Sequence, residues 1–238
     1  MSRNLNIAFL MDPLETLDLK GDTTFALAIE AQRRKHHISF FKPEDLIFSN
    51  NDVLANICEL ELSESNNLYE FKYHDTFIKP LSNYDVIMMR QDPPFNMAYI
   101  SATHILEKLS NSTLIVNNPF EVRNSPEKIF VTNFSHLMPK TLISRNIDAI
   151  QEFRKQFKDI IIKPLYGNGG QGIFHILPED ENLNSILEMF FNQNKEPLMI
   201  QEYLKDVPRV LRYCKEVLDR HSDLKDLNQL VSQASILD

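Results

Sequence analysis

The sequence predicts an α/β protein in which an open, mainly parallel sheet comes first and a second α/β region with a helical tail follows. Short apolar runs alternate with helix-like segments through short connections, which is typical of sheets whose helices cover both faces. The chain has 238 residues, of which 43% are hydrophobic and 24% are charged. This length and composition suffice for one large or two modest domains with real cores.

The first 122 residues contain the alternation that predicts the open sheet. Asp22 can cap a first helix, in which Phe25 and Ile29 recur at helical spacing. Two longer stretches, near 55–62 and 68–74, favour an antiparallel strand pair. The other predicted strands are 6–11, 38–41, 84–90 and 113–116, and the predicted helices are 22–35 and 97–109.

Two clusters of Asn and Pro, at 117–119 and 124–126, interrupt this pattern, and we place a domain boundary near Val122. Residues 123–206 form the second domain in this prediction. Residues 207–238 form a tail in which apolar side chains recur at the spacing of an amphipathic helix or helix pair. The second domain is predicted to contain helices at 126–134, 147–157 and 182–192 and strands at 140–143, 159–163, 172–176 and 198–201.

Four of the chain's five glycines fall within six residues, directly after the apolar run 160–164. Glycine accepts positive φ and lets the backbone approach a ligand closely, so such clusters mark tight turns or phosphate-binding loops. Lys163 adds a cation at the end of the preceding strand. The glycine loop, as we call it, consists of Gly167, Asn168, Gly169, Gly170, Gln171 and Gly172.

The residues after the glycine loop decide which kind of phosphate loop is expected. Residues 173–176 resemble a strand, whereas P-loops and dinucleotide-binding folds require a helix at this place. The P-loop pattern also needs a Lys-Ser or Lys-Thr pair, which does not follow here. We therefore expect a glycine-rich hairpin that closes over phosphates, with a plain hairpin turn as the alternative.

Polar side chains at the ends of two predicted parallel strands form a second candidate site. Ligands bind at the carboxyl ends of strands in open α/β sheets. Asp12 follows the first strand, and Arg90 and Asp92 follow the strand at 84–90. These three residues are candidates for a substrate pocket; the alternative is a structural turn in which Arg90 pairs with a carboxylate.

Composition excludes several classes of function. The net charge of −8 and the lack of a basic stripe argue against a nucleic-acid partner. We find no signal peptide and no apolar run near the ~20 residues that span a membrane, so we expect a cytoplasmic protein with no membrane partner. Cys58 and Cys214 are far apart and lack metal-ligand spacing, which predicts buried free thiols.

Several separate segments resemble the bacterial glutathione synthetase family in order along the chain. They are 7–15, 22–27, 89–95, 116–119 and 162–165, together with the glycine loop. The resemblance extends from about Leu5 to Asp206. It implies an ATP-grasp ligase that joins the carboxylate of γ-glutamylcysteine to the amine of glycine through an acyl-phosphate, with ATP and Mg²⁺ (or Mn²⁺). Residues 1–122 would then precede the ATP-grasp domain, and 123–206 would be its first half.

The resemblance also assigns roles to residues of this chain. Lys128 and Lys163 match two lysines that contact the ATP phosphates, and the glycine loop matches the flap over the triphosphate. Without the resemblance, Lys128 is an ordinary solvated helix lysine. The resemblance also implies a strand end that would receive adenine; without the resemblance it is an ordinary strand end. It consists of Gln201, Glu202, Tyr203 and Leu204.

After Asp206 the sequence departs from the family pattern. The resemblance implies acidic residues and an asparagine that hold the metal, but the chain has no Glu-x-Asn here and no glycine after Gly172. We expect the metal-binding half to be absent and ligase activity to be crippled as a result. A disrupted gene is the explanation that fits best, because the resemblance breaks off inside a domain. A complementing second chain and a retained regulatory fragment are the alternatives.

Three functional hypotheses follow from these observations. The leading one is a glutathione-synthase-type ligase by descent, acting on γ-glutamylcysteine and glycine as small-molecule substrates. The second is another ATP-grasp ligase, for example one that joins glutamate to a small protein or cofactor. The third is a non-catalytic ATP- or dipeptide-binding module, or one subunit of a split ligase. A homo-oligomer or a complementing chain is the expected kind of protein partner.

Overall fold

The computed structural model describes residues 3–65, 68–167 and 170–205. The chain divides into two compact units, each described here by itself. The first unit comprises Met1–Phe134 and Pro164–Gly172, and the second comprises Ser135–Lys163 and Ile173–Asp238. The helical tail predicted at 207–238 lies outside the described residues. Within the described part of the chain, no helix is long and apolar enough to cross a membrane.

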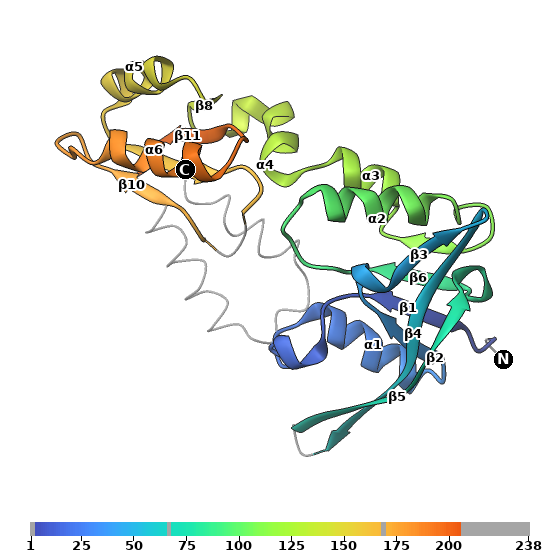
Figure 1. The fold of residues 1–238 in the computed structure, drawn as a ribbon. Coiled ribbons are helices and arrows are strands. Elements are labelled where there is room, and N and C mark those ends of the chain that lie inside the picture. The colour runs from blue at the N-terminus through green and yellow to red at the C-terminus, as the bar shows by residue number, and fades with distance from the viewer. Residues whose placement is uncertain (1–2, 66–67, 168–169, 206–238) are drawn as a thin grey trace. The chain divides into compact units, whose positions relative to one another are not determined.

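The first unit is built on a mixed sheet whose order is β3-β4-β2-β1-β6-β7, with β5 paired to β4 (Figure 1). Strands β2, β1, β6 and β7 are parallel, as predicted, and β3, β4 and β5 extend the sheet in antiparallel fashion. The strands are β1 (Asn6–Leu10), β2 (His37–Phe41), β3 (Leu46–Ser49), β4 (Asp52–Ser65), β5 (Leu68–Pro80), β6 (Val86–Met89) and β7 (Leu114–Val116).

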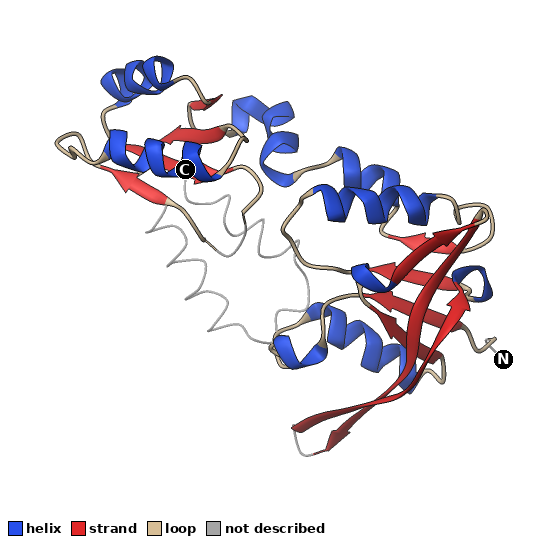
Figure 2. Ribbon diagram, viewed as in Figure 1, coloured by secondary structure: helices blue, strands red, loops and turns tan. Residues whose placement is uncertain are grey.

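Helix α1 (Thr23–Arg33) covers one face of this sheet (Figure 2). It begins at Thr23 because the Asp22 carboxylate accepts a hydrogen bond from the Phe25 amide at 2.7 Å, the capping contact that the sequence predicts. Alternate residues of a strand point to opposite faces. The buried cluster on this face therefore takes every second residue of β1 and includes Ile7, Phe9, Met11, Phe25, Ala28 and Ile29.

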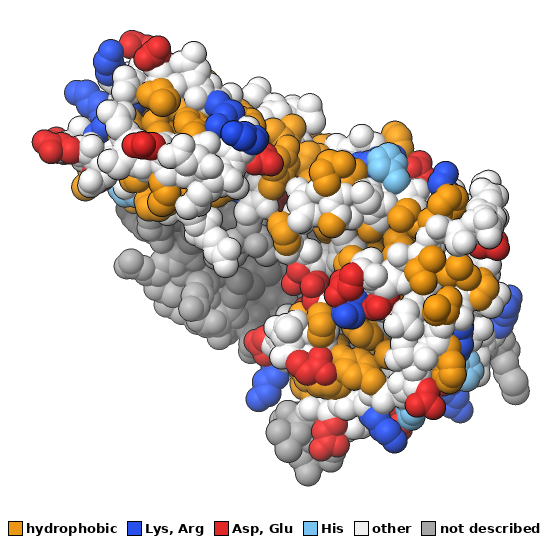
Figure 3. Space-filling model, in the orientation of Figure 1, with side chains coloured by type: hydrophobic (Ala, Val, Ile, Leu, Met, Phe, Trp, Pro, Cys, Tyr) orange, Lys and Arg blue, Asp and Glu red, His pale blue; other side chains and the backbone are white. Residues whose placement is uncertain are grey.

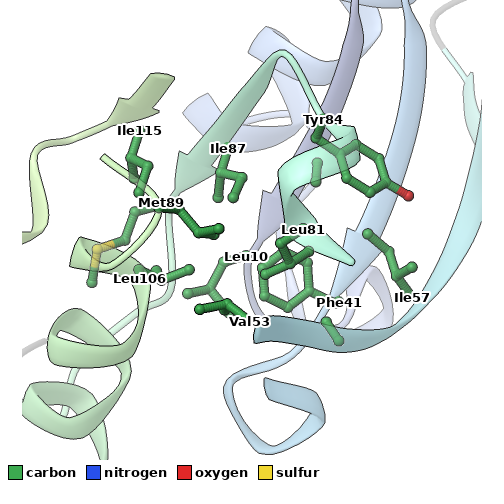
Figure 4. Close-up of a cluster of buried hydrophobic side chains, with 13 residues drawn as sticks. Leu10, Phe41, Val53, Ile57, Leu81, Tyr84, Ile87, Met89, Leu106 and Ile115 are labelled. Carbon is green, nitrogen blue, oxygen red and sulfur yellow. The ribbon is translucent and has the colours of Figure 1, made fainter. Parts of the chain in front are cut away.

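Helix α2 (Met97–Glu107) covers the other face, where Ala8 and Leu10 of β1 are buried (Figure 4). Leu106 of α2 is completely buried against this face. The predicted helices on both faces are thus confirmed, and parallel strands buried on both sides explain the continuous apolar runs. This second cluster includes Ala8, Leu10, Phe41, Val53, Leu81, Ile87, Met89 and Leu106.

Strands β4 and β5 form a long antiparallel hairpin that projects past the ends of the other strands (Figure 1). The predicted pair at 55–62 and 68–74 is confirmed, although both strands are longer than expected. Strand β3 was missed because its four residues are only half-buried or exposed, which leaves little alternation in the sequence. The Tyr73 hydroxyl of β5 accepts a hydrogen bond from the Leu14 amide at 3.1 Å, so the hairpin fixes the segment after β1.

The single helix predicted at 126–134 is wrong in detail. Helix α4 (Glu127–Phe130) is short, and a 3₁₀ segment (Val131–Leu137) follows in which Phe134 leaves helical geometry. Helix α3 (Pro119–Asn124) was not predicted from the sequence. Its signal was available, because Asn118 caps the helix and Pro119 opens it, an arrangement typical of helix starts.

The second unit contains a four-stranded sheet of order β10-β9-β11-β8 with helices α5 (Ile147–Phe157) and α6 (Leu183–Gln193). Strands β9 and β10 pair antiparallel, which confirms the predicted strand–loop–strand arrangement around the glycine loop. The core packs Ile150 of α5 and Leu187 of α6 on the sheet. The strands are β8 (Thr141–Ser144), β9 (Ile160–Pro164), β10 (Phe174–Ile176) and β11 (Leu198–Glu202).

Both units leave large hydrophobic side chains at the surface, and many orange atoms are visible on the face drawn in Figure 3. Acidic and basic side chains are interspersed among them on that face. Exposed examples include Met97, Phe120, Phe130, Leu137, Leu177 and Leu204.

Candidate functional site

The first unit brings Asp12 and Asp92 together at the carboxyl ends of β1 and β6. These strands are parallel neighbours, with Leu10 opposite Met89, so the residues that follow them meet at one edge of the sheet. The Asp92 backbone amide donates a hydrogen bond to the Asp12 carboxylate at 2.7 Å. This contact joins the segment after β1 to loop 92–95.

The Arg90 side chain is held by α1 and not by a carboxylate. Its Nε donates to the Thr24 hydroxyl at 3.1 Å, and its Nη2 donates to the Thr23 hydroxyl at 2.6 Å. None of the ion pairs among the described residues involves Arg90. The alternative, a structural turn in which Arg90 pairs with a carboxylate, is therefore not observed. Since a guanidinium has five N–H donors, most of them are left for a ligand.

Negative charge is concentrated around Asp92. Burial raises the pKa of the Asp92 carboxyl, the charges of Asp12 and Asp22 raise it further, and Arg90 acts in the opposite direction. The same environment affects Tyr99, whose pKa is raised by burial first and then by the Asp92 charge. Between Arg90 and Asp92, the buried Gln91 Oε1 has no hydrogen-bond partner among the described residues. A positively charged group would be favoured here.

Lys128 anchors the start of the glycine loop to α4. Its Nζ donates hydrogen bonds to the carbonyl of Leu165 at 3.4 Å and to the carbonyl of Gly167. An ammonium group has three donors, and these two bonds account for two of them. Lys128 is therefore not the solvated helix lysine that its position alone would predict.

The glycine loop follows Lys163, which is half-buried at the end of β9 in the second unit. Asn168 and Gly169 lie outside the described residues. Gly170 and Gly172 have φ of 76° and 68°, a region that residues with a Cβ rarely adopt. The loop conformation thus requires glycine at these two positions.

A cavity of about 430 Å³ lies within the first unit, between loop 92–95 and Lys128. The rings of Phe95 and Tyr166 stack with centroids 6.1 Å apart, and those of Phe95 and Tyr99 are 5.1 Å apart. Tyr99 and Tyr166 were not singled out from the sequence. The available signal was their position, since Tyr166 directly precedes the glycine loop and Tyr99 lies shortly after loop 92–95. The lining also includes Pro93, Asn117, Glu121, Ser125, Glu127, Lys128 and Gly167.

The strand end predicted to receive adenine belongs to β11 in the second unit. Gln201 Nε2 donates to the Thr141 hydroxyl at 2.9 Å, and Glu202 Oε1 accepts from the Lys140 amide at 3.0 Å. The Tyr203 amide donates to the Asp159 carbonyl at 3.0 Å. These groups are engaged inside the unit, and Leu204, which is exposed, follows them.

His175 packs beside this strand end and was not singled out from the sequence. Its ring stacks on the Tyr203 ring, with centroids 4.0 Å apart and planes inclined by 24°. Its Nε2 lies 3.3 Å from Asp159 Oδ1, close enough for an ion pair when the imidazole is protonated but without the alignment of a hydrogen bond. His175 thus contacts the Tyr203 ring, while the Asp159 carbonyl accepts a hydrogen bond from the Tyr203 amide.

The predicted residues therefore fall into two groups. The first unit holds Asp12, Arg90, Asp92, Lys128 and the described part of the glycine loop, and the second holds Lys163 and 201–204. Among the described residues, no group of three or more His, Cys, Asp or Glu side chains could hold a metal ion. The described residues do not fit a divalent metal, and we derive no step through one.

The structure has an ATP-grasp fold. It is similar to an ATP-grasp RimK domain protein from Sphaerobacter thermophilus, with a TM-score of 0.54 and 15% identity over 84% of this chain and 64% of that one. It is also similar to a D-cycloserine synthetase, with a TM-score of 0.54 and 15% identity over 85% of this chain and 61% of that one. At such low identity the likeness shows the fold alone.

The family is shown by the sequence comparisons. The model of the prokaryotic glutathione synthetase N-terminal domain matches residues 5–123, half of the chain, and the model of that family's ATP-grasp domain matches 127–210. The chain belongs to the prokaryotic glutathione synthetase family.

Three curated relatives, each named glutathione synthetase, are similar to this chain. They come from Mesorhizobium japonicum (49% identity), Brucella melitensis (47%) and Agrobacterium fabrum (46%), and the matches cover 85% to 87% of this chain. The chain spans 64% to 65% of the length of these relatives.

Proposed function

We propose that this chain provides the N-terminal domain and the first part of the nucleotide site of an ATP-dependent ligase that joins γ-glutamylcysteine to glycine. The observation that carries this proposal is the pair of hydrogen bonds from Lys128 to the carbonyls of Leu165 and Gly167. They hold a cation at the base of a loop whose described glycines adopt positive φ, on the wall of a cavity of ligand size. Relatives at 46% to 49% identity carry the name glutathione synthetase.

The chemistry requires an activated carboxylate. The cysteinyl carboxylate of the dipeptide attacks the γ-phosphorus of ATP, so that ADP leaves and an acyl-phosphate forms. The amine of glycine then attacks the acyl carbon, phosphate leaves, and the amine proton is released as the amide forms. Lys128 and Lys163 would neutralise the phosphate oxygens, and the glycine loop would shield the acyl-phosphate from water. The Mg²⁺ or Mn²⁺ that the family implies would have to be held by residues other than the described ones.

The strand end at 201–204 would bind adenine. The Tyr203 amide is engaged with Asp159, so the backbone of Leu204 becomes the candidate to contact the polar edge of the base. The Tyr203 ring, held against His175, would form one side of the base pocket.

Asp12, Arg90 and Asp92 would recognise the amino-acid head of the dipeptide. An ammonium group suits the crowded carboxylates, whose repulsion contributes to the raised pKa of Asp92. The remaining donors of Arg90 suit a carboxylate. Since ATP and the small substrates are cytoplasmic, we also propose a cytoplasmic location, with which the buried, unpaired Cys58 agrees.

Calorimetric titration with a non-hydrolysable ATP analogue tests the nucleotide site. We expect saturable binding that Lys128→Met and Lys163→Met each weaken about tenfold, the loss of roughly one charge-assisted contact. Lys155→Met is the matched control, because Lys155 is exposed on α5 and pairs there with Glu152. Absent binding, or equal affinity in all three variants, would contradict the proposal.

A second candidate is a non-catalytic ATP- or dipeptide-binding module, or one subunit of a split ligase. It is favoured by the lack of a metal-ligand group among the described residues. Phosphate release in the presence of ATP, Mg²⁺, γ-glutamylcysteine and glycine separates the two candidates. ATP binding without phosphate release favours the module, and release that depends on both acceptor substrates favours the ligase.

A further inference from the structure

We propose that the outer edge of β5 pairs in antiparallel fashion with β5 of a second copy of this chain, so that one sheet continues across a dimer. The surface lies wholly in the first unit. The proposal does not depend on the ligase function, because none of the residues that carry it belongs to the binding sites proposed above.

Strand β5 is an edge strand with one long unpaired side. It has 13 residues, and among the strands that the structure describes only β4 pairs with it. The hairpin that the two strands form projects past the ends of the other strands (Figure 1). An edge strand presents a row of backbone N–H and C=O groups with which another strand can pair. Within the described part of the first unit, the outer side of β5 is therefore open to a second chain.

A β-bulge in the middle of β5 determines which of its side chains share a face. Tyr73 and Thr76 lie opposite alternate residues of β4, so the two residues between them, His74 and Asp75, face a single residue of β4. Such an extra residue shifts the alternation of side chains by one position. Tyr73 and Thr76 therefore point to the same face, although an odd number of positions separates them.

This shift allows β5 to pair with itself in register. A two-fold axis perpendicular to the sheet, placed between His74 and Asp75, opposes each residue of one half of β5 to a residue of the other half. Opposed residues must point to the same face, which a regular strand could not achieve about this axis and the bulged strand does. The resulting pairs are Tyr73 with Thr76, Lys72 with Phe77, Phe71 with Ile78 and Glu70 with Lys79.

The charges on the two halves of β5 are complementary about this axis. Glu70 of one copy lies opposite Lys79 of the other, and the symmetry produces this pair twice. Opposite charges directly across a strand pair stabilise it, and like charges destabilise it. Within the chain, Lys79 pairs only loosely with Glu59, at 3.6 Å, and 38% of its side chain is exposed. Its ammonium group, which has three donors, can therefore bond a second carboxylate.

The same pairing covers two large apolar side chains. Phe77 and Ile78 are 55% and 64% exposed in the single chain. Ile78 would lie against Phe71 of the second copy, a ring that packs on the buried cluster of the α1 face. Phe77 would lie against the apolar stem of Lys72. Exposed apolar side chains on an edge strand invite uncontrolled association, and a specific partner strand accounts for their presence here.

The symmetry of β5 distinguishes this pairing from simple protection of the edge. Lysines and bulges also occur on edge strands as devices that prevent pairing. That role needs no symmetry, whereas Glu70 and Lys79 lie at equal distances along the chain from the two bulge residues. Because the arrangement is self-complementary, a second copy of this chain is the partner that it fits.

Sedimentation equilibrium of the full chain tests the pairing. The measurement covers about a hundredfold range of concentration, because an interface of one strand pair is small and its dimer weak. We expect a reversible equilibrium between monomer and dimer for the wild type. Glu70→Lys and Lys79→Glu each oppose like charges at two points, so each should weaken the dimer about tenfold or more.

A charge exchange provides the decisive variant. The double variant Glu70→Lys/Lys79→Glu restores both ion pairs with their signs reversed, and its dimer affinity should return to within about threefold of the wild type. Glu152→Lys is the matched control, because it makes the same change of charge on the exposed surface of α5; it should leave the affinity unchanged. Urea denaturation of each variant shows that its fold is intact.

Amide hydrogen exchange is a second measurement that needs no variant. Raising the wild-type concentration through the dimerisation range should slow exchange in the peptide of residues 70–79 and leave exchange in α5 unchanged. A wild type that stays monomeric, or a dimer whose β5 amides exchange as fast as in the monomer, overturns the proposal. A double variant that remains as weak as the single variants also overturns it, because the opposition of Glu70 to Lys79 is then wrong.

Discussion

Lys128 donates a hydrogen bond to the carbonyl oxygen of Gly167, which lies 39 residues further along the chain. The bond connects a side chain of the short helix α4 to the first residue of the glycine loop. A second bond, to Leu165, holds the same segment. Contacts inside the first unit therefore fix Lys128 and the start of the glycine loop to each other.

Replacement of Lys128 should loosen the start of the glycine loop. In Lys128→Met both carbonyls lose a charged donor, and each such bond contributes about 1.5–3 kcal/mol in a typical protein. We expect faster amide hydrogen exchange in the peptide that contains Leu165 and Gly167. Lys155→Met, on the surface of α5, should leave that exchange unchanged. Equal exchange in the two variants would show that the bonds do not restrain the loop.

Alanine substitutions should distinguish two glycines of the same loop. Gly170 has φ of 76° and a Cβ would meet nothing within 4 Å, so Gly170→Ala suffers backbone strain alone, about 1–2 kcal/mol. At Gly167 a Cβ would have its nearest neighbours at an ordinary 3.6 Å, and no positive φ opposes it. Gly167→Ala should therefore be near neutral in free energy of unfolding, as measured by urea denaturation. A larger loss at Gly167 would contradict this assignment.

The Tyr73 hydroxyl should stabilise the segment after β1. It accepts from the Leu14 amide at 3.1 Å and donates to Glu15 at 3.2 Å. Tyr73→Phe leaves the Leu14 amide unpaired, which we expect to lower the free energy of unfolding by about 1–2 kcal/mol. Tyr69→Phe is the control, because the Tyr69 ring contributes an edge contact with Phe25 that survives loss of its hydroxyl. Urea denaturation at neutral pH measures both.

Tyr73 also predicts a dependence of stability on alkaline pH. Burial, with Glu15 adding to it, raises the pKa of Tyr73 from 10.0 to about 12. The phenol then keeps its proton in the folded protein at a pH where the unfolded chain has lost it. Its contribution to stability is present in full below pH 10 and is lost as the pH rises through about 12. Wild type should lose stability more steeply over this window than Tyr73→Phe; equal slopes would refute the shift.

The raised pKa of Asp92 should likewise make the stability of the folded protein decrease with rising pH, here in the acidic range. Its pKa is raised, mainly by burial and then by Asp12 and Asp22, so the folded protein holds this proton more tightly than the unfolded chain. The stabilisation is complete below the ordinary aspartate pKa of about 3.9 and is lost as the pH rises through the higher folded value. At neutral pH, Asp92→Asn should be at least as stable as the wild type.

The stability difference between Asp92→Asn and the wild type should depend on pH. Below about pH 3.9 the advantage of Asp92→Asn over the wild type should disappear, because both side chains are then neutral. Asp75→Asn on the exposed part of β5 serves as the control. Urea midpoints of the three proteins at acidic and neutral pH provide the measurement. An advantage that grows on acidification would reverse the predicted sign.

Local signals in the sequence predicted the parts of the fold that local chemistry controls. The Asp22 cap, the apolar runs of β1 and β6 and the hairpin around the glycine loop are all confirmed. The helix at α3 was missed although its cap is local, because two Asn- and Pro-rich clusters indicated a linker instead. The edge strand β3 was missed because an exposed, short strand has little alternation to detect.

The sequence by itself determined the fold class, the family and the residue types available for phosphate and amino-acid recognition, since these depend on periodicity and on motifs. Only the tertiary structure decided which groups are already engaged. It showed that Arg90 is held by hydroxyls of α1, that Lys128 is bonded to the glycine loop, and that Tyr99 and Tyr166 share a cavity wall with Phe95. These relationships join residues far apart in the chain, and only packing brings such residues together.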